Sequence, residues 1–137
     1  MVLRRLAAAL FLLPAAALAG APVEDLEAVF RGMTLDGVYA DGLFFSETYF
    51  EDGLIRYHDA TGADSGEWSV RDGMFCTFYE TQQGACFFVR RDGENCFTFY
   101  ESVAGEDGSL APRPDWTSRG WDRSRDPTCP ENPEAVI

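Results

Sequence analysis

Short runs of aromatic and β-branched residues alternate with glycine-containing turns through most of this chain. Val, Tyr, Phe, Trp and Thr favour the pleated, half-buried surface of a strand. The densest stretch, 66–101, therefore predicts four antiparallel strands, and 33–40, 43–51 and 54–59 predict three before it. The pattern indicates a mainly β fold: an antiparallel meander of six or seven strands, forming a curled sheet or a small up-and-down barrel.

Asp-Gly dipeptides between the apolar runs predict tight two-residue hairpin turns, because glycine readily takes positive φ. They occur at 41–42, 52–53, 72–73 and 92–93. A turn at 72–73 places Val70 opposite Phe75 and puts Trp68 and Tyr79 on the same face, which we predict to be core.

The same argument at 52–53 predicts a different pair on the water-facing side of its hairpin. It sets Glu47 opposite His58, and Phe50 opposite Ile55 on the apolar side. We therefore expect Glu47 and His58 to form a surface pair across neighbouring strands.

Two segments flank the predicted sheet. Residues 22–31 predict one short N-terminal helix, with Pro22 in its first turn and an apolar face that packs on the sheet or plugs one end of it. Residues 102–137 predict an irregular C-terminal tail tied down by a disulfide, with room for one short strand around 115–121.

The first residues have the pattern of a secretory signal peptide. Arg4 and Arg5 precede an apolar run, and small residues at 17–19 form a cleavage site. The run is too short for a membrane span, and Ala21 stands where a lipid-anchored protein would need cysteine. We expect a periplasmic or secreted protein, cleaved near Ala19, with one β-rich domain at 20–137 and no membrane anchor.

The net charge excludes some classes of partner. The chain has a formal charge of −12 and no lysine. Loss of two arginines with the leader gives −12 − 2 = −14 for the mature protein. This charge opposes binding to nucleic acid and to anionic membranes, and admits cationic partners.

Four cysteines in an exported chain predict two disulfides, with three possible connectivities. We favour Cys76–Cys86, between neighbouring strands, and Cys96–Cys129, which ties the tail to the sheet. No Cys-x-x-Cys motif is present, so we expect no zinc site. The oxygen-rich segment 59–66 departs from the EF-hand spacing and predicts a plain loop; we therefore expect no metal.

His58 is the only conventional neutral-pH base in the sequence. A small hydrolase using His58 and Glu47 is one alternative, but no serine stands in a nucleophile-elbow context and no phosphate-binding or dinucleotide motif is present. We expect no enzymatic activity, no catalytic residue and no cofactor.

The residues Gly66-Glu67-Trp68, then Phe75-Cys76, then Cys86 form a G-x-W…F-C…C pattern. In this pattern the chain resembles small exported, uncharacterised β-domain proteins of Gram-negative bacteria. The resemblance implies a small antiparallel β domain with a strand-to-strand disulfide; it implies no assigned activity and no catalytic residues.

Aromatic residues occupy both faces of the strands in 75–100, so the second face must meet the helix, the tail, another subunit or a ligand. We predict an exported, non-catalytic binding or accessory module of unknown ligand; a lipocalin-like small-molecule carrier is the concrete alternative. The partner is then a small ligand or an envelope protein, and the chain a monomer or weak homodimer.

Overall fold

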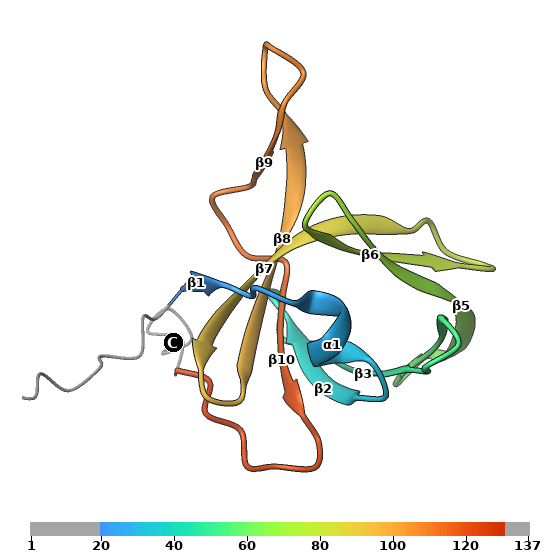
Figure 1. Cartoon of the computed structure of the whole chain (residues 1–137). Helices are drawn as coiled ribbons and strands as arrows, with labels where there is room; N and C mark the ends of the chain where they lie inside the picture. The colour runs from blue at the N-terminus through green and yellow to red at the C-terminus, as the bar shows by residue number, and fades with distance from the viewer. Residues whose placement is uncertain (1–19, 131–137) are drawn as a thin grey trace, which may run out of the picture.

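The computed structural model describes residues 20–130 and shows a sheet curled into a barrel (Figure 1). The predicted leader at 1–19 and the end of the predicted tail, 131–137, lie outside the described residues. The elements, in chain order, are β1 (Ala21–Pro22), α1 (Leu26–Phe30), β2 (Thr34–Tyr39), β3 (Phe44–Tyr49), β4 (Leu54–Asp59), β5 (Gly62–Arg71), β6 (Met74–Tyr79), β7 (Ala85–Gly93), β8 (Cys96–Ala104), β9 (Leu110–Pro112) and β10 (Ser118–Asp122).

The barrel is antiparallel and closed, which confirms the predicted small up-and-down barrel. Strands β2 to β8 each pair with the next, and β10 closes the ring by pairing with β8 on one edge and β2 on the other. Eight strands of the described chain form the ring, against the six or seven predicted. Strand β1 adds to the edge of β7, and β9 pairs with the outer part of β8 as a projecting hairpin (Figure 1).

Strand β10 lies in the predicted tail, where the sequence left room for one short strand around 115–121. Its sequence has no run of β-branched residues and contains Gly120 at its centre. The glycine is required by packing, since a Cβ there would lie 2.6 Å from Leu35 Cδ2. The strand therefore forms because its neighbours fit against it, a tertiary effect that residue propensity does not report.

The turn at Asp72-Gly73 is the predicted two-residue turn. Both residues have positive φ, 52° and 74°, and Val70 pairs with Phe75 as expected. Trp68 and Phe75 are buried, while Val70 and Tyr79 pack against the core they form.

The hairpin at Asp52-Gly53 differs from the prediction by one residue. Only Gly53 has positive φ, and Phe50 N–H donates to Leu54 O at 2.9 Å, so the loop contains three residues. Trp68 holds this loop, because its Nε1 donates to Phe50 O at 2.9 Å. Adding one residue moves every side chain of a strand to the opposite face relative to its partner.

The shifted register replaces the predicted cross-strand pairs. Glu47 pairs with Tyr57, and His58 pairs with Ser46. Phe45, Glu47 and Tyr49 share one face of β3, on which Phe45 and Tyr49 are buried in the core. The Glu47–His58 surface pair therefore does not form.

Two further local predictions need correction. The segment 59–66 is mostly strand, because β4 runs to Asp59 and β5 begins at Gly62. The Asp59 carboxylate stabilises the short turn between them by accepting from Thr61 N at 2.8 Å. The turn predicted at Asp92-Gly93 lies two residues later, at 94–95, since Gly93 pairs with Cys96 after a bulge.

The helix closes one end of the barrel, but it is shorter than predicted. It begins at Leu26 behind Asp25, whose carboxylate caps it by accepting from Ala28 N at 3.0 Å. Pro22 belongs instead to strand β1. Phe30 points into the barrel and is fully buried; its ring centroid lies 4.8 Å from that of Phe75.

The C-terminal segment is fastened to the outside of the barrel at this same end. Cys96 is bonded to Cys129, and Cys76 to Cys86, so the described chain contains both disulfides that the sequence favoured. Beside the first of them, the buried Asn95 side chain accepts from Asp122 N at 2.8 Å and donates to backbone carbonyls of the segment, including Asp126 O at 3.1 Å. The C-terminal segment therefore covers only part of the outer face of the barrel.

Candidate functional site

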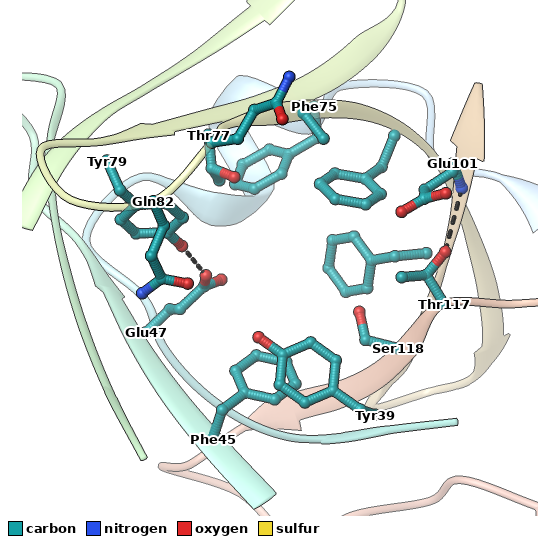
Figure 2. A pocket seen from close by; sticks show the side chains of 14 residues that line it. Tyr39, Phe45, Glu47, Phe75, Thr77, Tyr79, Gln82, Glu101, Thr117 and Ser118 are labelled. Atoms are coloured by element: carbon teal, nitrogen blue, oxygen red, sulfur yellow. Dashed lines mark hydrogen bonds between the residues drawn. The ribbon is translucent and has the colours of Figure 1, made fainter. Parts of the chain in front are cut away.

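The other end of the barrel opens into a pocket of about 190 Å³ (Figure 2). Strand ends surround it: β2 ends there at Tyr39, β6 at Tyr79, and β7 and β10 begin there. Its lining is contributed by Tyr39, Phe45, Glu47, Phe75, Thr77, Tyr79, Gln82, Gln83, Ala85, Phe87, Phe99, Glu101, Thr117 and Ser118. We call this the mouth pocket. It is smaller than the roughly 300–1,000 Å³ of pockets that hold drug-sized ligands.

Aromatic rings form the floor and walls of the mouth pocket. Phe75 and Phe99, with ring centroids 6.0 Å apart, lie above Phe30, the residue that plugs the other end. On one wall the Tyr39 and Phe45 rings are 4.5 Å apart. The mouth pocket thus has mainly apolar walls, and its floor is the packed core of the barrel.

A carboxyl group stands inside the mouth pocket. Glu47 accepts hydrogen bonds from the hydroxyls of Tyr49, at 2.5 Å, and Tyr79. Protein surrounds the side chain, yet the residue is only partly buried, because it lines the open pocket (Figure 2). The carboxyl group is therefore held in place and remains open to a ligand.

Burial raises the pKa of Glu47, and the two hydroxyl hydrogen bonds oppose this change without cancelling it. In turn, burial and the nearby carboxylate raise the pKa of Tyr49 and of Tyr79, so both hydroxyls stay protonated as donors. No salt bridge to Glu47 is formed within residues 20–130. Ionised Glu47 is thus a negative charge without a protein counter-ion.

Other polar groups surround the opening. Tyr39 donates to the Tyr57 hydroxyl at 3.2 Å, and Tyr57 donates to Asp59 at 2.7 Å, which orders one side of the barrel. At the rim, Glu101 is exposed and lies 3.7 Å from Arg113. Within residues 20–130, the side chains that line the pocket include acids, amides and hydroxyls but neither arginine nor histidine.

His58 lies on the outside of the barrel and is separated from Glu47 by the wall. It lines an outer groove together with Asp36 and Ser46. There Ser46 donates to Asp36 at 2.5 Å, and Arg123 Nη2 donates to Asp36 at 2.7 Å. The Arg123 hydrogen bond holds the pKa of Asp36 below its usual value. The hydrolase alternative required Glu47 and His58 to meet, so it loses its geometric basis.

Replacing Glu47 with glutamine tests the environment of the buried carboxyl group. Because its folded-state pKa is raised, protonated Glu47 adds stability below the unfolded pKa of about 4.3, and this contribution is lost as pH rises through the folded pKa. We expect Glu47→Gln, which does not titrate, to gain stability relative to wild type as pH rises from about 4 to 8. Urea unfolding across this range measures the difference.

Glu101→Gln is the control, since it removes one acid from the exposed rim of the same pocket. If the stability of Glu47→Gln relative to wild type stays constant with pH, or falls as pH rises, the assigned environment is wrong.

Sequence reasoning paired the four cysteines correctly but placed Glu47 on the outer face, so it did not identify Glu47 as a residue of the mouth pocket. The missed signal was the alternation Phe45, Glu47, Tyr49, which sets one acid between two aromatic residues on a single strand face. Within residues 20–130 no three His, Cys, Asp or Glu side chains gather as a metal site.

The two disulfides indicate a compartment outside the cytoplasm. In the described part of the chain no helix is both long and apolar enough to cross a membrane. In comparisons with known proteins, no family model matches the chain, and neither a curated protein nor a solved structure matches it significantly. The resemblance noted from the sequence stays a prediction.

Proposed function

We propose that this protein is an exported, non-catalytic binding module that holds a small ligand in the mouth pocket. The observation that supports this most directly is the pocket itself, in which polar groups converge inside aromatic walls at the end of a closed barrel. A lipocalin-like carrier is the specific form of this function that a barrel with one plugged end and one open end favours.

The construction of the barrel fits a preformed site. Phe30 and the rings packed on it fill the end of the barrel opposite the mouth pocket, so in the described structure a ligand reaches the interior from the mouth. The Cys76–Cys86 disulfide joins β6 to β7 directly beside Thr77 and Ala85, which line the pocket. A ligand would therefore meet a wall that is already ordered, and binding would require little loss of conformational entropy.

Replacing Ala85 with tryptophan tests the proposal by filling the pocket. Ala85 lines the mouth at the start of β7, so a large ring there occupies the space that a ligand needs. We expect protein isolated from the periplasm to show an additional bound mass in native mass spectrometry, and Ala85→Trp to lose it. Ala111→Trp, at an exposed position on β9, is the matched control and should retain it.

Two outcomes would contradict this function. One is an identical bound mass in all three proteins, which would put the ligand elsewhere. The other is a wild-type protein that carries no additional mass and whose thermal unfolding is unchanged by every member of a library of small metabolites. Circular dichroism of the two tryptophan variants checks that each is folded.

A further inference from the structure

The geometry points to a small organic ammonium ion as the ligand of the mouth pocket, with Glu47 as its counter-ion and the surrounding rings as its walls. This inference rests on the proposed function and adds to it the chemical class of the ligand. Three features of the pocket support it: its charge, its ring arrangement and its size.

Charge is the first feature. The ionisable acids that line the pocket are Glu47 inside and Glu101 at the rim, and no arginine or histidine lines it. An anionic ligand would meet the like charge of Glu47 there, while the charge of Glu101 is partly offset by Arg113, 3.7 Å away. An uncharged ligand would leave ionised Glu47 with its two hydroxyl partners but without a counter-ion, in a pocket from which the ligand displaces water, which is unfavourable. A ligand with one positive charge supplies the missing counter-ion.

The rings are the second feature. Glu47 lies among aromatic residues, with Phe45 and Tyr49 beside it on β3 and Tyr79 bonded to it from β6. The faces of aromatic rings carry partial negative charge and attract ammonium groups, most strongly where water is excluded. Tyr39 and Phe87 complete the walls. A carboxylate within such walls can bind an ammonium group and its alkyl substituents together.

Size and donor number are the third feature. A pocket of about 190 Å³ admits a compact molecule or one end of a longer one. A metal cation needs several oxygen ligands, whereas no three acidic, histidine or cysteine side chains in the described chain lie close enough together to hold one. A single carboxylate supported by hydroxyls is sufficient for an ammonium ion.

The test compares two molecules of one shape: choline, and 3,3-dimethylbutan-1-ol, in which carbon replaces the charged nitrogen. Calorimetric titration of the mature protein should show choline binding about 30-fold more tightly than the alcohol, or more. Glu47→Gln should lose this preference and bind both within about threefold. Glu67→Gln removes the same charge from an exposed position on β5, outside the pocket, and should change choline affinity by less than about threefold.

A pH titration gives a second readout, because choline keeps its charge at every pH. Choline affinity should rise as Glu47 ionises and then level off. The groups that face Glu47 are the Tyr49 and Tyr79 hydroxyls, with Tyr39 and Glu101 further around the pocket. Tyr79→Phe removes one hydroxyl from the carboxylate and should move the midpoint of this rise to higher pH. This variant also serves if Glu47→Gln does not fold.

The outcomes separate this inference from the proposed function. Three results would overturn the assignment of the ligand as an ammonium ion. They are equal affinity for choline and the alcohol, no detectable choline binding, and a choline affinity that neither Glu47→Gln nor Tyr79→Phe changes. The binding function would still stand if Ala85→Trp removed the native bound mass. If Ala85→Trp still carried the bound mass, the ligand would not lie in the mouth pocket, and both the binding function proposed for this pocket and the ammonium ligand would be wrong.

Discussion

Replacing Phe30 with alanine is expected to lower the free energy of unfolding by about 3–5 kcal/mol. Phe30 is fully buried, and its ring contacts Tyr49, Phe75, Phe97 and Phe99 at centroid distances of 5.5, 4.8, 5.0 and 5.9 Å. The helix that carries it has only five residues and is too short to persist without this contact. Loss of the ring therefore leaves a cavity and also releases the segment that closes the barrel.

Urea unfolding of Phe30→Ala measures this effect, with Phe44→Ala as the matched control. Phe44 is 70% exposed on the outer face of β3, so the same substitution there should change stability by no more than about 0.5 kcal/mol. A loss of less than about 1 kcal/mol at Phe30 would show that the barrel does not need its plug. Such a result would also remove the argument that the mouth is the single entrance.

The two Asp-Gly turns show how far the fold could be predicted. Hydrophobic alternation predicted most of the strands and the barrel, because a one-sided apolar pattern is required wherever a sheet encloses a core. The same dipeptide, however, closes hairpins in two ways. At 72–73 both residues adopt positive φ, whereas Asp52 instead accepts from Leu54 N at 3.1 Å and the loop gains a residue.

The extra residue in the 51–53 loop is the reason that the predicted pair of Glu47 and His58 was wrong. With the three-residue loop, Tyr49 pairs with Ile55 and both are buried, while Thr48 pairs with the exposed Arg56. This is a cleaner division of apolar from polar residues than the register that we predicted. The exception is Glu47, an acid on the inner face. This residue of the candidate site breaks the pattern that would otherwise fix the register, so the sequence argument failed at the candidate site itself.

The sequence left room for strand β10 but could not predict its pairing, for a different reason. Its central residue is a glycine, which propensity disfavours in strands, and its partners β2 and β8 lie far from it in sequence. Two contacts secure the neighbouring chain. The Cys96–Cys129 disulfide was predicted from the sequence, but the hydrogen bond from Asp122 N to the Asn95 side chain at the end of β10 is visible only in three dimensions. Closure of the barrel therefore depends on the segment that carries the least sequence pattern.

Removing the Cys96–Cys129 disulfide tests that dependence. The double variant Cys96→Ala/Cys129→Ala should lose about 4 kcal/mol of stability, against about 3 kcal/mol for Cys76→Ala/Cys86→Ala. The order follows from loop length, since the sequence separations are 33 and 10 residues and the longer loop restricts the unfolded chain more. Urea unfolding of both double variants measures the two losses, and each variant is the control for the other.

Hydrogen exchange distinguishes a change in the unfolded chain from local opening of the barrel. If the disulfide fastens β10, amides of Ser118–Asp122 should exchange faster in Cys96→Ala/Cys129→Ala, while those of the β5–β6 hairpin change less. A uniform increase in exchange rate across the barrel would instead show that the disulfide stabilises the protein only by restricting the unfolded chain. Because Ser118 lines the mouth pocket, the first result would also couple closure of the barrel to ligand binding, and the variant should bind its ligand more weakly.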